Sequence, residues 1–437
     1  MQKYSNKIKS KLLSIIKEME ESKETFVKEP SKDFIRNRKL SFSHVLQLLL
    51  SMNGSKSFTD LLHYFNFNED MPSLSALIQQ RNKLSKEAMP YLFHRFTSSY
   101  DKFKKVKGYR LLAVDGSMLN IYHNPKDFST HVKTVPTYKG HNKLHVNAVY
   151  DLCNKLFVDA CIQATRERNE SRALINMVNR SGITDKAIII ADRGYEAYNN
   201  FAHIEKKGFN YIIRVKDIKS RGITSSLALP ETDEFDVKIK TILTRRVKSI
   251  PINRRHEYKK LSTTSPFDFI DNGTVETYPM EFRIVRFAIG EDSYETIITN
   301  LDKTEFSLIE IKELYNLRWG IENSFRELKY LVGLNSLNSK KVELIIQEIY
   351  AKLTMYNFCS MIVTNTKIKN KNRKYEYKIN FSKAITICKE FFKYRDNEIP
   401  PNVEVLLQRY ISPIRNGRKY PRKITCQSWV NFMYRVA

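Results

Sequence analysis

The sequence predicts an α/β protein built around a mixed sheet, and two observations support this fold class. Between residues 109 and 216, β-rich and helix-like runs follow the order strand, strand, strand, helix, strand, helix, strand. A hairpin meander followed by strands that alternate with helices is typical of a mixed α/β sheet. In the first 100 residues and again after about residue 307, apolar residues recur at spacings that indicate helices.

The chain divides into five predicted regions. Residues 1–100 are expected to form an all-helical N-terminal domain, and residues 101–216 form the first part of the α/β core. Residues 217–300 contain strand-like runs between polar loops, which predicts a β-rich insertion. Residues 301–365 complete the core with further helices. Residues 366–437 form a basic helical C-terminal region with 17 Lys or Arg and 5 Asp or Glu.

The charge of the chain predicts a polyanionic partner. The 437 residues include 74 Lys plus Arg and 47 Asp plus Glu, so the formal net charge is +27. A surplus of this size favours nucleic acid or an anionic membrane surface as the partner. Because 42% of the residues are hydrophobic, the chain can bury a core, which excludes a disordered basic tail protein.

The sequence predicts neither a membrane protein nor a secreted one. No stretch reaches the roughly 18 apolar residues that a membrane span requires. The charged N-terminus lacks the apolar segment of a signal peptide. Five cysteines lie far apart without a CxxC pair, a pattern that fits neither a zinc finger nor a disulfide framework. We therefore expect a soluble cytoplasmic protein with no membrane partner.

One helix of the N-terminal domain is a candidate for reading DNA. In SLSALIQQRNKL, four polar residues are expected to point outward: Gln79, Gln80, Arg81 and Lys83. A helix with such a face could enter a DNA groove and bind there. The competing interpretation is an ordinary solvated face in a small helical bundle.

Two acids stand at the predicted ends of apolar strands. Asp115 ends the first strand in AVDGS, and Asp192 ends the fourth in IIIADRGY. Active sites in such sheets tend to open at the carboxyl ends of the strands. Either acid alone could be a simple turn residue. Arg193, beside Asp192, could contact DNA or pair with the acid.

A third acid lies in a long helix predicted at about 307–332. At roughly 100° per residue, four side chains of this helix fall within about a 60° stripe beside an apolar flank: Tyr315, Arg318, Glu322 and Lys329. Glu322 and Lys329 are too far apart to form an i,i+4 pair. The stripe could be a surface with incidental charges. Alternatively, Glu322 holds a metal while its basic neighbours bind phosphates.

The spacing Tyr-x2-Arg-x3-Glu-x6-Lys resembles the signature of bacterial insertion-sequence transposases of the insertion-sequence-four group. VDGS and DRGY are similar to the contexts of that family's first two acids. The resemblance covers roughly residues 40–340. It implies a ribonuclease-H-like core, interrupted by a β-rich insertion, in which three acids form a DDE triad: Asp115, Asp192 and Glu322.

The chemistry of such a triad requires cations. Three converging carboxylates would raise each other's pKa, and divalent cations remove this conflict. Oxygen-only ligands favour Mg²⁺, with Mn²⁺ as a substitute, and two ions could activate the nucleophile and stabilise the leaving oxygen. No small-molecule cofactor is expected.

The resemblance also implies an activity, namely cut-and-paste transposition of an insertion sequence. The protein would bind double-stranded DNA at the terminal inverted repeats, cleave it, and join the 3′ ends to target DNA. A homodimer is expected, because two equal ends must be held together. The competing interpretation is a catalytically silent DNA-binding protein derived from a transposase.

Several residues near Glu322 are expected to contact DNA. Arg318 and Lys329 would bind phosphates beside the cleaved bond. Tyr315 could stack on the DNA end or form a hydrogen bond with it. Trp319 is a candidate stacking partner for a flipped base, or a core residue. Arg326 is a further candidate contact.

Two further sets of polar residues are less informative. Glu167 and Glu170, in TRERNE, could be acids that interact with a helix N-terminus, or one of them could lie near the metals. His141 and His145, in KGHNKLHVN, are expected to be loop or strand-face residues and not metal ligands.

Overall fold

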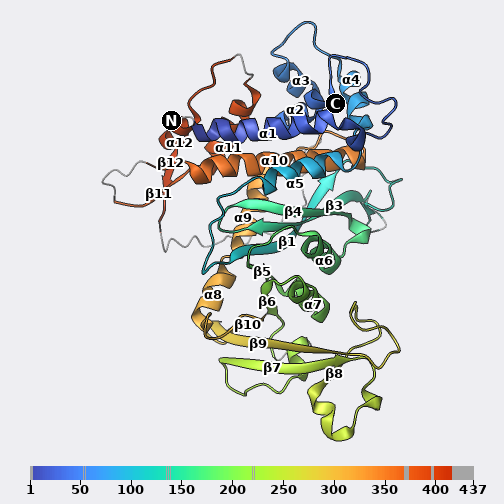
Figure 1. Ribbon diagram of the computed structural model, residues 1–437, viewed down its shortest axis with the longest axis vertical. Coiled ribbons are helices and arrows are strands. Elements are labelled where there is room, and N and C mark those ends of the chain that lie inside the picture. Colours follow the sequence, from blue (N-terminus) through green and yellow to red (C-terminus); the bar gives the residue numbers. More distant parts are fainter. Residues whose placement is uncertain are drawn as a thin grey trace.

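The structure is a computed structural model that describes residues 3–415 except 53, 55, 134, 136, 138, 219, 221, 369–373 and 395–397. Within these residues, twelve α-helices accompany a ten-stranded mixed sheet, which confirms the predicted α/β class. Figure 1 shows a helical bundle at one end, the core of the sheet in the middle, and long antiparallel strands at the other end.

The middle of the sheet has the predicted order of strands and helices. Its strands lie in the order β4-β3-β1-β5-β6, with β1, β3 and β4 antiparallel and β1, β5 and β6 parallel. The elements are β1 (Arg110–Ile121), β2 (His131–Val132), β3 (His141–Asp151), β4 (Leu156–Ala164), α6 (Glu170–Arg180), β5 (Ala187–Ala191), α7 (Tyr198–Lys206) and β6 (Asn210–Val215). The short β2 pairs with the start of β3.

The strands predicted between 217 and 300 are present, and they extend the same sheet. Because β10 pairs antiparallel with β6, the insertion continues the hydrogen-bond ladder of the core. Beyond β10 the order is β9-β7-β8. The bounds are β7 (Phe235–Thr244), β8 (Tyr258–Lys260), β9 (Thr277–Gly290) and β10 (Ser293–Thr299).

The two faces of the sheet bind different helices (Figure 1). Val114 belongs to the apolar cluster that contains α6 and α7, whereas Ala113 belongs to the cluster that contains α9 (Trp319–Tyr330) and α10 (Val342–Asn365). Since successive side chains of a strand point to opposite faces, Asp115 points to the same side as Ala113. That is the side on which α9 packs against β1.

The N-terminal region is all-helical, as predicted. It comprises α1 (Lys3–Glu21), α2 (Phe42–Ser51), α3 (Ser57–Tyr64), α4 (Leu74–Lys83) and α5 (Ala88–Ser98). These helices and the sheet share one apolar cluster, because α10 is buried along most of its length between them. The C-terminal part adds α11 (Phe381–Lys393), α12 (Val403–Arg409) and the strand pair β11 (Tyr377–Ile379) and β12 (Ile411–Pro413); residues 416–437 lie outside the described residues. None of the described helices is both long and apolar enough to cross a bilayer.

The prediction that the polar side chains of α4 point outward is wrong for two of them. Arg81 is 2% exposed and donates to Glu348 of α10 at 3.1 Å, and Gln80 is 5% exposed. The side chain of Lys83 is 28% exposed. The Glu348 carboxylate compensates the positive charge of the buried Arg81 guanidinium. This side of α4 packs against α10, so it is not available to DNA.

The long helix predicted at about 307–332 is two helices. A turn at 317–318 separates α8 (Leu308–Asn316) from α9. Tyr315 packs in a cluster with β6, β9 and β10, whereas Phe325 packs in the cluster with β1 and α10. The chain turns between α8 and α9 because the apolar faces of the two helices pack into different clusters. The four signature residues therefore do not share one helical stripe.

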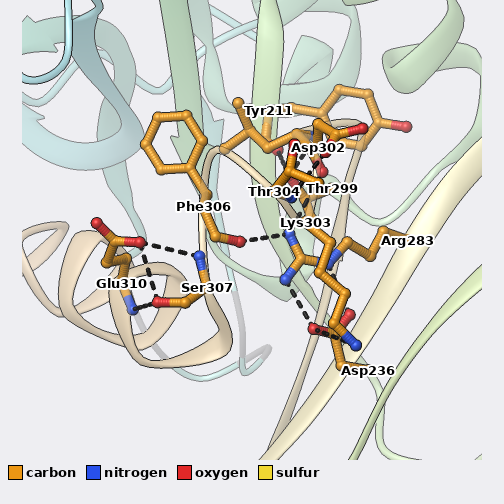
Figure 2. Close-up of polar contacts among 11 residues, drawn as sticks. Tyr211, Asp236, Arg283, Thr299, Asp302, Lys303, Thr304, Phe306, Ser307 and Glu310 are labelled. Carbon is orange, nitrogen blue, oxygen red and sulfur yellow. Dashed lines mark hydrogen bonds and ion pairs between the residues drawn. The ribbon is translucent and has the colours of Figure 1, made fainter.

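Arg283 of β9 joins the long strands to the start of α8 (Figure 2). Its guanidinium donates to both carboxylate oxygens of Asp236 at 2.6 and 2.7 Å and to the carbonyl of Phe306 at 2.8 Å. The next residue, Ser307, forms a capping box with Glu310 that begins α8. One buried side chain thus fixes β7, β9 and the approach to the helix pair.

We expect Arg283→Ala to lower the free energy of unfolding by about 2–4 kcal/mol, because the nearly buried Asp236 carboxylate loses its two-oxygen contact and keeps only the longer ion pair with Lys303 at 3.6 Å. Urea denaturation followed by circular dichroism measures the change. Lys240→Ala is the control, since Lys240 is 78% exposed in a surface ion pair with Glu281, and it should leave the midpoint nearly unchanged. Equal midpoints for Arg283→Ala and the wild type would contradict the role of Arg283.

Candidate active site

The register between two parallel strands places two acids side by side. The ladder between β1 and β5 ends where Val114 lies opposite Ala191. Asp115 and Asp192 are the next residues on these neighbouring strands. Since adjacent strands are roughly 4.8 Å apart, the two carboxylates start from adjacent backbone positions at the carboxyl end of β5. Asp192 ends its strand as predicted, but Asp115 does not, because pairing with β3 continues β1 to Ile121.

Backbone amides hold both carboxylates. Asp192 is the N-cap of the short turn Arg193–Tyr195, and its Oδ1 accepts from the amide of Gly194 at 2.8 Å. Asp115 accepts from the amide of Gly116 at 2.7 Å. Arg193 is exposed next to these acids. The carboxylates are therefore fixed by the chain immediately after each of them.

Glu322 reaches this edge from the other layer. It lies in the first turn of α9, and its Oε1 accepts from Arg318 Nη1 at 2.9 Å. Arg318 is 5% exposed, whereas the side chain of Glu322 is 35% exposed. The buried guanidinium orients the third acid from within the turn that precedes its helix.

The charges of Asp192 and Glu322 act on Asp115. The pKa of Asp115 is raised to about 6, mainly because burial disfavours its charged form, and the negative charges of Asp192 and Glu322 add to this effect. The Gly116 amide and the Arg318 charge oppose it. Asp115 therefore lies within electrostatic range of the other two acids that the sequence singled out.

The donor set fits a hard divalent cation, although the side chains do not form a closed cage. Carboxylate oxygens are the ligands that Mg²⁺ and Mn²⁺ prefer, and a cation would relieve the charge that raises the pKa of Asp115. Among the described residues, no three His, Cys, Asp or Glu side chains are close enough together to hold an ion as they stand. The Arg318 ion pair occupies one oxygen of Glu322.

Two other signature residues contact protein groups. Lys329 donates to the carbonyl of Met118 on β1 at 2.9 Å, and burial lowers its pKa. Tyr315 is 2% exposed, so its ring cannot stack on a DNA end in this arrangement, and the expectation of such stacking is wrong here. Both residues secure the helices around Glu322 to the sheet.

Two candidate DNA contacts on α9 are accessible. Trp319 is 48% exposed, with the Arg318 guanidinium 4.9 Å from its ring, so it is not a core residue. Arg326 is exposed about two turns further along the same helix. Of the expected DNA contacts of α4 and α9, these two are the most available to a ligand.

The sequence did not reveal the role of a buried histidine near the acids. His145 lies on β3, as its strand-face interpretation predicted, and its Nε2 is 3.3 Å from Oε1 of Glu170 at the start of α6. A Cβ on Gly116 would collide with the His145 imidazole. In the sequence, the glycine directly after Asp115 was the available signal that another side chain lies close to this position. That side chain is His145, 29 residues further along the chain, and it could not be identified without the strand register.

Known proteins resemble this chain in both sequence and structure. Residues 106–358 match the family described as Transposase DDE domain. The transposase for insertion sequence element IS1151 of Clostridium perfringens is 22% identical over 330 residues, 69% of this chain and 68% of that protein. The transposase for insertion sequence element IS421 of Escherichia coli is 39% identical over 57 residues, 13% of this chain and 15% of that protein.

A solved structure of the piggyBac transposase synaptic complex with hairpin DNA has a TM-score of 0.44 and 11% identity, over 86% of this chain and 76% of that chain. The family match, in contrast, spans more than half of the chain and contains Asp115, Asp192 and Glu322. The chain therefore belongs to the Transposase DDE domain family.

Proposed function

We propose that this protein is the DNA transposase of an insertion sequence, which cuts the ends of its element and joins the 3′ ends to target DNA. The observation that supports the proposal is that Asp192 and Glu322 lie close enough to the buried Asp115 carboxylate for their charges to act on it. Asp115 and Asp192 follow the last pair of a parallel ladder, and Glu322 faces them from a helix packed on β1. The strand order β4-β3-β1-β5-β6 supports a ribonuclease-H-like core.

In this proposal, Asp115, Asp192 and Glu322 hold the divalent cations. Mg²⁺, or Mn²⁺ in its place, would supply as a pair of ions the Lewis acidity that phosphoryl transfer needs. Arg318 orients Glu322, and the Lys329 bond to Met118 keeps α9 seated on β1. No side chain has to act as a covalent nucleophile.

DNA is the partner that the charge and the exposed residues favour. The net charge of +27 suits a protein that binds phosphates along a duplex. Trp319, Arg326 and Arg193 are exposed near the acids and provide stacking and phosphate contacts. A homodimer would hold two element ends at once, and the site of action would be the bacterial cytoplasm, at the nucleoid.

The competing function is a transposase-derived protein that binds element ends without cutting them. Binding alone would not require three acids to converge, and such a cluster costs stability because it raises the pKa of Asp115. The convergence therefore favours the enzyme.

Replacing Glu322 by Gln is expected to lower Mg²⁺-dependent cleavage of DNA carrying the element's own ends by at least about 100-fold, with end binding retained. The amide keeps the shape of the side chain but removes a charged ligand. Glu313→Gln is the matched control, since Glu313 is exposed on α8. This variant should cleave the DNA as the wild type does. Gel assays for cleavage and for end binding measure both properties.

If the wild type and both variants bind the ends and none cleaves in Mg²⁺ or Mn²⁺, the silent DNA-binding function is correct. Equal cleavage by the wild type and Glu322→Gln would remove Glu322 from the proposed triad.

Asp115→Asn is expected to stabilise the cation-free protein at neutral pH. A carboxyl whose pKa is raised in the folded state to about 6 contributes stability that is complete below its unfolded value of 3.8 and is lost as the pH rises through about 6. The Asn amide does not ionise, so the variant does not lose this stability. The difference in the free energy of unfolding between Asp115→Asn and the wild type should therefore grow between pH 4 and 7.5 to roughly 2–3 kcal/mol.

Urea denaturation in EDTA at several pH values measures this gain. Asp271→Asn, in an exposed loop, is the control and should show no such trend. A difference between wild type and Asp115→Asn that stays constant from pH 4 to 7.5 would contradict a strained Asp115 carboxylate.

A further inference from the structure

A fourth carboxylate lies beside Asp192. Gly194 has no side chain, and a Cβ placed there would lie 3.0 Å from Asp192 Oδ1 and 3.4 Å from Glu170 Oε2. The two carboxylate oxygens are therefore separated by no more than the sum of these distances. Two carboxylates at such a separation could hold divalent cation together.

The carboxylate of Glu170 is held in a way that leaves one oxygen for a ligand. Arg168 Nη2 donates to its Oε1 at 2.7 Å, and His145 Nε2 lies 3.3 Å from the same oxygen. These contacts, the His145 bond above all, lower the pKa of Glu170, so it stays ionised. Within the described residues, Oε2 takes part in neither contact, and it is the oxygen that faces Gly194.

Among the described residues, several buried polar atoms of this region have no hydrogen-bond partner. His145 Nδ1, Asn147 Oδ1 and the hydroxyl of Tyr195 are buried without a hydrogen bond among the described residues, in side chains that are at most 1% exposed. Burial raises the pKa of Tyr195, and the charges of Glu170, Asp115 and Asp192 raise it further. Buried groups of this kind normally bind an ion, a water molecule or a ligand.

A purely local role for Glu170 does not explain these contacts. An acid in the first turn of a helix stabilises it through the helix dipole, but that effect needs no buried histidine. Glu167, three residues earlier, is exposed and has no comparable contacts. The glycines at 116 and 194, next to the two strand-end acids, also leave the space in which His145 and Glu170 lie.

We propose that Glu170 is a fourth carboxylate of the active site that binds divalent cation together with Asp192, and that His145 and Arg168 are its positioning residues. This inference rests on the proposed function, since it concerns the same cation site. It assigns the start of α6 to the site, in addition to β1, β5 and α9.

Calorimetric titration of the full-length protein with Mn²⁺ alone, without DNA, tests the proposal. Glu170→Gln should weaken Mn²⁺ binding by about 10–100-fold, and His145→Asn should weaken it in the same direction, with unchanged circular dichroism. Glu167→Gln, three residues before Glu170, is the matched control, and this variant should bind Mn²⁺ as the wild type does. Asp192→Asn should abolish Mn²⁺ binding and is the control for complete loss of the cation site.

A second variant separates cation binding from helix stability. Glu170→Asp keeps the negative charge at the helix start but shortens the side chain by one methylene. It should weaken Mn²⁺ binding if Glu170 reaches the cation, and should have no effect if the charge serves only the helix dipole.

The outcomes distinguish this inference from the proposed function. Wild-type affinity in Glu170→Gln and Glu170→Asp, with binding lost in Asp192→Asn, would overturn the role of Glu170 and leave the triad intact. Absence of Mn²⁺ binding by the wild type would overturn the proposed function and this inference with it.

Discussion

The site depends on one register, the parallel pairing of β1 with β5 that ends at Val114 and Ala191. A shift of one residue would send the Asp115 side chain to the opposite face, away from α9. The register is fixed by the apolar residues before it, since β5 is buried throughout and belongs to clusters on both faces of the sheet. The hydrophobic core thus determines where the acids meet.

A concentration of negative charge follows from this arrangement, and the surrounding residues compensate it. Arg318 pairs with Glu322, backbone amides bind Asp115 and Asp192, and Arg168 pairs with Glu170. These contacts fix the orientation of each carboxylate in the protein alone. A cation has to compete with the Arg318 contact to gain both oxygens of Glu322.

Local patterns predicted the strands, the helices and the three acids, because each depends on neighbours in the sequence. Asp115 and Asp192 follow apolar strands, and Glu322 lies in a spaced motif. Features that depend on partners far away in the sequence could not be predicted from local patterns. Arg81 is buried because Glu348, far along the chain, lies opposite it.

The same reason explains the helix turn and the histidine. The turn at 317–318 exists because two separate apolar clusters receive the flanking helices. His145 faces Glu170 across a space that Gly116 leaves open. Such contacts become visible only once the strand register is known.

The position of α10 has a mechanical consequence. This helix is at once the centre of the helical bundle and the support of one face of the sheet, and its side chains are buried along most of its length. Within the described residues, the bundle and the sheet that carries Asp115 consequently share one continuous, close-packed core. In the proposed function, a duplex that touched both the bundle and the edge of the sheet would have to bend, so the flexibility of the DNA end would contribute to its recognition.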